Sequence, residues 1–215
     1  ATHEQLSGRV IQQDGATSLS NHATHVAGTL IGDGTPVASA KGMAPQATLW
    51  AYDWSNDDAE MAAAAANGLL VSNHSYGFAT GWSSGPRWWG DTAYSFKEDV
   101  GFGLYSSPAI SWDQIAEAAP YYLIVKSAGN DRNDAPPSNG TDYEYRTSGT
   151  LFSYDSSDPT RSPEQDGGSD GYDCISWAGN AKNILTVGAV DDVLSYSGAG
   201  DVGMSSFSGW GPTDD

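Results

Sequence analysis

Residues 20–30 read SNHATHVAGTL, and this stretch predicts a short helix with a histidine close to its first turn. Ser20 or Asn21 can cap such a helix, because a short polar side chain accepts a hydrogen bond from the free N–H groups of the first turn. Apolar residues at the spacing of one helix face follow, and these are Val26, Ala27, Leu30 and Ile31. His22 is therefore expected on a rigid element, where a general base can be aimed at a substrate.

The composition favours one sizeable acidic domain. A chain of 215 residues is long enough to bury a substantial core. Its 27 acidic and 9 basic residues give a net charge of −18, which disfavours nucleic acids and anionic membrane surfaces as partners. A solubilising surface on a secreted protein explains this charge, and adaptation to salt or several cation sites are the alternatives. No apolar run approaches the roughly 18 residues that cross a membrane. The single cysteine, Cys174, excludes an internal disulfide framework.

Expected strands alternate with expected helices along the chain, which is typical of an α/β fold with a parallel sheet. The expected strands are residues 47–52, 69–73, 121–126 and 184–190. The third of these is nearly all apolar, as expected for a strand that is covered on both faces.

Two further helices are expected between these strands. An alanine-rich helix should begin at Asn56 or Asp57 and end just before Gly68, which can act as a left-handed cap. A capping-box pattern at residues 111–114 predicts the start of the other helix, which Pro120 ends.

Two long segments interrupt the alternation of strands and helices. Residues 78–110 are rich in glycine, tryptophan and tyrosine and have no clear period. Residues 131–173 contain ten acidic residues and three arginines and are interpreted as a long acidic loop. Loops of this length are more often functional or mobile than accidental. We therefore expect one domain over residues 1–215 that contains these two segments as insertions.

Three more motifs follow the histidine helix in order, namely Ser75-Tyr76-Gly77, Ala128-Gly129-Asn130 and Ser206-Phe207-Ser208. The first two come directly after expected strands, where functional groups gather in open parallel α/β sheets. Hydrolysis of a peptide bond by a serine needs a base, a carboxylate that orients the base, and donors for the oxyanion. His22 is the candidate base.

Together these motifs resemble the core of the subtilisin-like serine proteases, the subtilases. The catalytic histidine of that family is the first in a His-Gly-Thr-His-Val-Ala-Gly-Thr pattern, and residues 22–29 differ from it only by Ala23. The family's Ala-Gly-Asn pattern matches residues 128–130, and its Ser-Leu-Gly strand matches residues 75–77 with Tyr76 in place of leucine. The resemblance covers nearly the whole chain except the two insertions.

The resemblance implies a subtilisin-like parallel sheet flanked by helices and the activity of a serine endopeptidase. It implies that His22 and Asn130 are catalytic, with His22 as the base and Asn130 as the candidate oxyanion donor. Substrate would add to a strand edge through main-chain hydrogen bonds. The residues implied in substrate binding are Ser75, Tyr76, Gly77, Ala128 and Gly129. The expected partner is a peptide or protein substrate, no cofactor is required, and the family's habit suggests secretion.

Two motifs of the family pattern are absent from this sequence. Subtilases place their triad in the order aspartate, histidine, serine. A Gly-Thr-Ser-Met-Ala pattern for the nucleophile and an Asp-(Ser/Thr)-Gly pattern for the orienting aspartate are both missing. Asp14 is close to His22 in sequence but lacks this context. We therefore expect a fragment truncated at both ends, inactive alone, of an active peptidase.

Three alternatives stay open from the sequence. The first is a non-catalytic member of the family that keeps the peptide-binding groove. The second is a metal-dependent hydrolase with His22 and His25 as ligands, although no His-Glu-x-x-His pattern is present. The third concerns a structural calcium ion, for which Asp166, Asp170 and Asp173 could supply oxygens. Their spacing is not that of an EF-hand loop, and a solvated acidic loop is the favoured interpretation.

Overall fold

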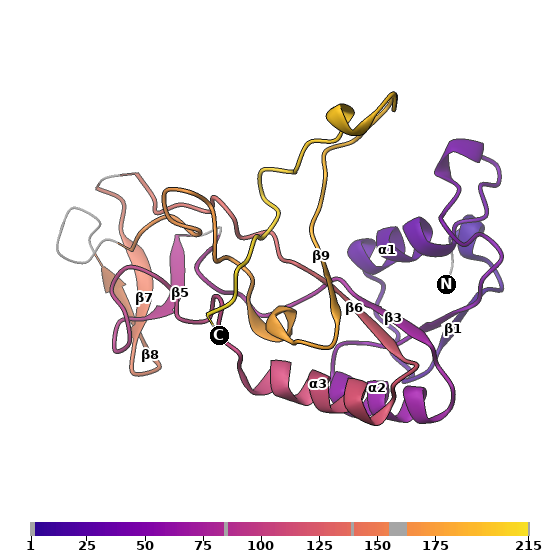
Figure 1. The fold of residues 1–215 in the computed structure, drawn as a ribbon, viewed down its shortest axis with the longest axis horizontal. Helices are drawn as coiled ribbons and strands as arrows, with labels where there is room; N and C mark the ends of the chain where they lie inside the picture. The colour runs from indigo at the N-terminus through magenta and orange to yellow at the C-terminus, as the bar shows by residue number, and fades with distance from the viewer. Residues whose placement is uncertain (1–2, 84–85, 139, 155–162, 215) are drawn as a thin grey trace. The chain divides into compact units, whose positions relative to one another are not determined.

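A computed structural model describes residues 3–83, 86–138, 140–154 and 163–214 (Figure 1). The chain divides into two units, Ala1–Glu60 and Met61–Asp215. Within the described ranges, none of the helices is both long and apolar enough to span a bilayer.

The first unit is built around α1 (Asn21–Ile31). Its other elements are η1 (Glu4–Leu6), β1 (Val10–Gln12), η2 (Ala38–Ala40) and β2 (Leu49–Ala51). Strands β1 and β2 pair in parallel. The side chain of Ser20 accepts a hydrogen bond of 3.2 Å from the N–H of Ala23, so the predicted cap of α1 is confirmed. Ala27 and Ile31 face inward and pack with Leu6, which confirms the predicted apolar face.

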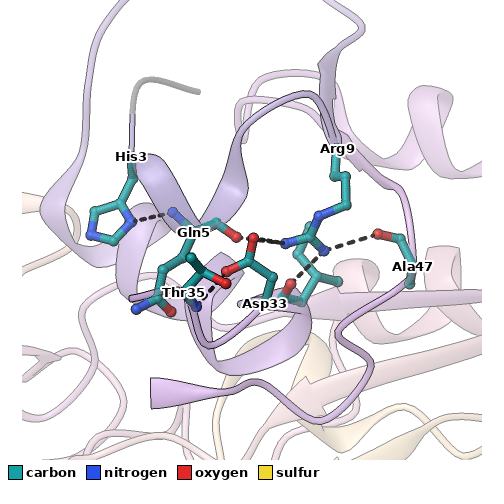
Figure 2. A network of polar contacts seen from close by, with 7 residues as sticks. His3, Gln5, Arg9, Asp33, Thr35 and Ala47 are labelled. Carbon is teal, nitrogen blue, oxygen red and sulfur yellow. Dashed lines mark hydrogen bonds and ion pairs between the residues drawn. The ribbon is translucent and has the colours of Figure 1, made fainter. Parts of the chain in front are cut away.

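Arg9 holds the C-terminal end of α1 (Figure 2). Its guanidinium donates to the backbone oxygens of Gln5, Ile31 and Ala47, and it lies 4.0 Å from the carboxylate of Asp33. The last carbonyls of a helix have no partner inside the helix and carry partial negative charge, so a cation there is stabilising. Arg9 thereby ties η1, α1 and the approach to β2 together.

The segment Gly42-Met43-Ala44 closes on the same end of α1. Its three backbone N–H groups donate to carbonyl oxygens at distances of 2.8, 3.0 and 2.7 Å. These acceptors are, in order, Gly32, Thr29 and Leu30. A Cβ placed on Gly42 would lie 2.6 Å from the backbone oxygen of Gly28, which is closer than atoms can approach. Glycine is therefore required for this contact.

The second unit contains a parallel sheet in the order β3 (Val71–His74), β6 (Leu123–Ser127) and β9 (Leu185–Val187). Helices α2 (Asp57–Ala66) and α3 (Ser107–Ala118) lie together along one face of this sheet (Figure 1). The core between them contains Met61, Trp112, Tyr122, Ile124 and Ala178. The α/β class with a parallel sheet is thus confirmed.

Side chains on the other face of the same sheet are more exposed within the second unit. Ile124 is 0% exposed, whereas Leu123 beside it in β6 is 41% exposed. Val71, Leu185 and Val187 are exposed on the neighbouring strands. Residues 121–126 are therefore buried on one face within the second unit, and the covering of both faces stays a prediction.

The two helix predictions differ in outcome. Gly68 follows α2 with a φ of 91°, which confirms the predicted left-handed cap. The capping-box prediction at residues 111–114 is wrong, because α3 begins at Ser107 with Ser106 as its N-cap residue. Pro108 suits the first turn, where a missing N–H costs nothing. Asp113 lies inside the helix, and its carboxylate accepts hydrogen bonds from the backbone of residues 182–183.

A second sheet combines the two interrupting segments. It has the order β4 (Trp82–Ser83), β5 (Arg87–Asp91), β7 (Tyr143–Thr147) and β8 (Thr150–Tyr154). Its core contains Trp82, Trp88, Tyr143 and Tyr145. The interpretation of residues 131–173 as a loop is therefore wrong for the hairpin β7–β8. Strands β5 and β7 come from different segments, so this sheet depends on pairing between residues that are far apart in the sequence.

Candidate active site

His22 occupies the first turn of α1 in the first unit, and its side chain is exposed. The Ser20 cap and the Arg9 contacts hold the two ends of this helix. His25 lies one turn further along and is also exposed. The structure thus places the predicted base at the entrance of a well-anchored helix.

Asp14, the carboxylate close to His22 in sequence, is engaged in a local turn. It accepts hydrogen bonds from the N–H of Ala16 at 3.1 Å, from the N–H of Asp53 and from the side chain of Gln12. The hydrogen bond from Asp53 is the largest cause that lowers the pKa of Asp14. These contacts give Asp14 a structural role at the ends of β1 and β2.

The predicted substrate-binding motifs lie in the second unit, at the carboxyl ends of two adjacent strands. In the parallel register of β3 and β6, His74 is opposite Lys126. Residues 75–77 and 128–130 therefore leave the sheet at the same edge. On the far side of β6, the N–H of Ala128 donates to the oxygen of Val187 at 2.9 Å, so this segment still follows β9.

Residues 128–130 form a tight turn. Gly129 has a φ of 93°, a conformation that side-chain-bearing residues rarely adopt. Its carbonyl accepts a hydrogen bond of 3.2 Å from the N–H of Gly209. Ala128 is buried, whereas the side chain of Asn130 is exposed. The turn thus anchors its first two residues and leaves the predicted oxyanion donor at the surface.

The motif at residues 206–208 is brought to this same region and has a scaffolding role. Ser208 is 1% exposed, and its hydroxyl accepts a hydrogen bond of 2.9 Å from the N–H of Ala189. Ser205 donates from its N–H to the oxygen of Ala189 at 3.0 Å. These bonds hold the motif against the segment that follows β9.

A buried polar chain lies beneath residues 75–77. The ring of His74 bonds to the hydroxyl of Tyr76 at 2.8 Å and to the hydroxyl of Ser72 at 2.7 Å, and Tyr122 donates to Ser72 at 2.6 Å. Burial, followed by the nearby charge of Lys126, lowers the pKa of His74 to about 4. His74 is therefore neutral near pH 7 and positions Tyr76.

Lys126 is a functional candidate that the sequence argument missed. It is 4% exposed, and its Nζ donates to the backbone oxygen of Ser127 at 2.8 Å and to the Ser127 hydroxyl at 3.1 Å. Burial lowers the pKa of Lys126 to about 8, while the charge of Asp131 opposes this effect. Burial also raises the pKa of Asp131 to about 6. A single lysine in the apolar run YYLIVK was the available signal.

The three aspartates considered as calcium ligands differ in their environments. Asp166 is buried and accepts a hydrogen bond of 2.7 Å from the N–H of Trp82. Burial is the main cause that raises the pKa of Asp166 to about 8 and that of Asp173 to about 6. Asp170 is exposed. Among the residues that the structure describes, no three histidine, cysteine or acidic side chains gather closely enough to hold a metal ion.

Comparison with known families agrees with the motifs. The model of the subtilase family, peptidase S8, matches residues 2–215. A search of curated proteins finds no match. Because the family model covers almost every residue, the resemblance carried by the four short motifs extends to the chain as a whole. The chain belongs to the subtilase family of serine peptidases.

Proposed function

We propose that this protein is a subtilisin-type serine endopeptidase that hydrolyses peptide bonds in extended segments of its substrates. The family match supports the reaction class. The observation that carries the proposal further is the parallel register of β3 and β6, which delivers residues 75–77 and 128–130 to one edge of the sheet.

Substrate binding in this proposal uses that edge. The backbone groups of Ser75, Tyr76 and Gly77 pair with the substrate backbone, as in the addition of a strand to a sheet. Ala128 and Gly129 line the other side of the bound peptide. The two glycines leave room for close approach, since neither carries a side chain.

The chemistry is assigned to His22 and Asn130. The imidazole of His22 takes the proton of the attacking serine hydroxyl and passes it to the leaving amine, while the amide of Asn130 donates a hydrogen bond to the oxyanion. The proposal assigns no residue of this chain to the nucleophile or to the orienting carboxylate. We also propose that the protein acts outside the cell, where its acidic surface would keep it soluble.

The experiment uses the full-length protein with any flanking sequence that its gene encodes. We expect it to cleave peptides and to be labelled by a serine-directed fluorophosphonate. His22→Ala should lower kcat by at least about 10⁴-fold, because the proton of the serine then has no acceptor. His25→Ala, one turn along the same helix, is the matched control and should leave kcat nearly unchanged. Equal losses in the two variants would overturn the assignment of the base.

A non-catalytic peptide-binding module is the second candidate. Its peptide-binding edge would be the same pair of strand ends, residues 75–77 and 128–130, although a binding groove needs neither His22 nor Asn130. Such a module would bind fluorescent peptides in an anisotropy titration, yet it would neither cleave them nor react with the fluorophosphonate. The same preparation therefore separates the two candidates.

A further inference from the structure

We propose that Lys126 makes the peptide-binding edge selective for an anionic substrate side chain, an aspartate or a glutamate, that enters beside Gly77. The inference rests on the proposed peptidase function and names the class of substrate that it would prefer.

The first argument is the position of the ammonium group. A Cβ placed on Gly77 would lie 3.9 Å from Nζ of Lys126 and 3.9 Å from Cε3 of Trp177. The empty side-chain position of Gly77 is therefore bordered by a cation and an aromatic ring. A substrate atom that occupied this position would lie at contact distance from both groups.

The second argument is the bonding capacity of Lys126. An ammonium group has three N–H donors, and the described contacts of Lys126 use two of them, both on Ser127. The ion pairs found in the described ranges are Arg9–Asp33, Arg87–Glu144 and Lys97–Glu164, and none of these includes Lys126. Among the described residues, Asp131 acts on Lys126 through its charge, but no carboxylate forms an ion pair with the ammonium group. A carboxylate brought by the substrate would supply that partner and stabilise the buried cation.

The wall opposite the ammonium is built with backbone strain. Trp177 has a φ of 55°, which is unusual for a bulky residue. Its ring lies 5.1 Å from that of Phe78 and 5.9 Å from that of Tyr76, and 6.0 Å from Nζ of Lys126. Strained residues of this kind are retained where surrounding contacts hold them in place and are frequent at ligand sites. Trp177 thereby packs against the residues that flank Gly77.

Lys126 is the positively charged group beside Gly77, as the states of its titratable neighbours show. His74 has its pKa lowered to about 4 and is neutral near pH 7. The carboxylate of Asp131 lies near the segment that follows β6, where its Oδ2 would be 2.9 Å from a Cβ placed on Gly129. Its charge helps to keep Lys126 protonated. The anion-selective position is thus next to Gly77, whereas the Asp131 carboxylate adjoins Gly129.

The experiment measures kcat/KM of the full-length protein on matched peptides. Each peptide carries Glu, Gln or Lys at one position at a time, and the other residues stay the same. We expect a preference for Glu over Gln of about tenfold or more at one position, which corresponds to one charge-assisted hydrogen bond. Lys126→Met should reduce this ratio to about one. Lys97→Met, which removes an exposed lysine, is the matched control and should keep the preference.

Wild-type protein supplies a second measurement in case Lys126→Met does not fold. The Glu-to-Gln ratio should fall as the pH rises from 7 to 9, because Lys126 loses its proton while effects on the catalytic groups cancel in the ratio. Of the other titratable neighbours, His74 and Asp131 are already deprotonated over this range. Cleavage without any preference for Glu, or a preference that Lys126→Met retains, would overturn the inference alone. If none of the peptides were cleaved, the result would instead contradict the proposed function.

Discussion

Two buried charged residues, Asp113 and Lys126, show how strongly the hydrogen-bond partners of a side chain affect its pKa. The carboxylate of Asp113 accepts hydrogen bonds from the N–H groups of Lys182 and Asn183 at 2.9 and 2.6 Å, and from the hydroxyl of Tyr105 at 2.7 Å. Burial opposes its ionisation, but these hydrogen bonds outweigh burial and lower the pKa of Asp113. Lys126 donates hydrogen bonds to the two oxygens of Ser127, and burial lowers its pKa to about 8 although the charge of Asp131 opposes this effect. The first is a satisfied structural charge, and the second is suited to a ligand.

Asp166 gives the first prediction at the residue scale. It is 5% exposed, and its pKa is raised to about 8, first by burial and further by Asp131, Asp134 and Asp99. A carboxyl group with a raised pKa binds its proton more tightly in the folded state. Its contribution to stability is therefore present below the unfolded value of 3.8 and is lost as the pH rises through 8.

Asp166→Asn should consequently stabilise the protein above pH 8, by roughly 1–3 kcal/mol in the free energy of unfolding. The amide keeps an oxygen that accepts the bond from the N–H of Trp82. Urea denaturation at pH 5 and at pH 8.5 measures the effect, which should be small at the lower pH. Asp170→Asn, an exposed neighbour, is the control and should change little at either pH. A destabilised Asp166→Asn variant at pH 8.5 would contradict the prediction.

At the scale of elements, the end of α1 is shaped by backbone contact with the segment after Gly42. Three N–H groups from this segment bond to carbonyls near the end of the helix, and Arg9 bonds to another. The position of a helix that carries a candidate base is thus controlled from its opposite end. Local capping by Ser20 starts the helix, but tertiary contacts decide how it ends.

Gly42→Ala tests this contact. The added methyl would lie 2.6 Å from the backbone oxygen of Gly28 and 2.6 Å from the backbone nitrogen of Gly32. We expect a loss of roughly 1–3 kcal/mol in the free energy of unfolding, because backbone atoms must move apart. Urea denaturation followed by circular dichroism provides the measurement.

Gly28→Ala is the matched control on the other side of the same contact. Among the described residues beyond the backbone of its own helix, a Cβ on Gly28 meets no atom within 4 Å, and alanine favours the helical state. This variant should therefore gain roughly 0.5–1 kcal/mol in stability. Similar effects of the two substitutions, in either direction, would show that close packing at Gly42 is not what requires glycine.

At the scale of the whole molecule, the two side chains proposed as catalytic belong to different units of the chain. His22 lies in the first unit, and Asn130 lies in the second. Asn130→Ala in the full-length protein should lower kcat by about 10²–10³-fold with little change in KM, a loss known for the corresponding side chain in subtilisin itself. The reason is that the amide acts on the oxyanion, which is absent from the bound substrate.

Steady-state kinetics on one peptide substrate measures this loss. Asn67→Ala, which truncates an exposed asparagine after α2, serves as the control and should keep the wild-type kcat. An increase in KM at constant kcat would instead place Asn130 in ground-state binding, and the oxyanion role would then be wrong.

Several elements could be predicted because their signals are local. The Ser20 cap, the apolar face of α1 and the left-handed Gly68 depend on residues within one or two turns of each other. The capping-box prediction failed because Asp113 bonds to residues 182–183, which are distant in sequence. The hairpin β7–β8 had a period-two signal in Tyr143 and Tyr145, but the acidic composition of the segment obscured it.

The sequence by itself determined the family, the α/β class and the identity of the motif residues, because these depend on residue type and order along the chain. The tertiary structure decided which segments share a sheet and where the buried charges point. Strands β5 and β7 pair across more than 50 residues, and the ammonium of Lys126 meets Gly77 only because β3 and β6 align in parallel register. Such contacts depend on the packing of segments far apart in the chain, which no local pattern of residues specifies.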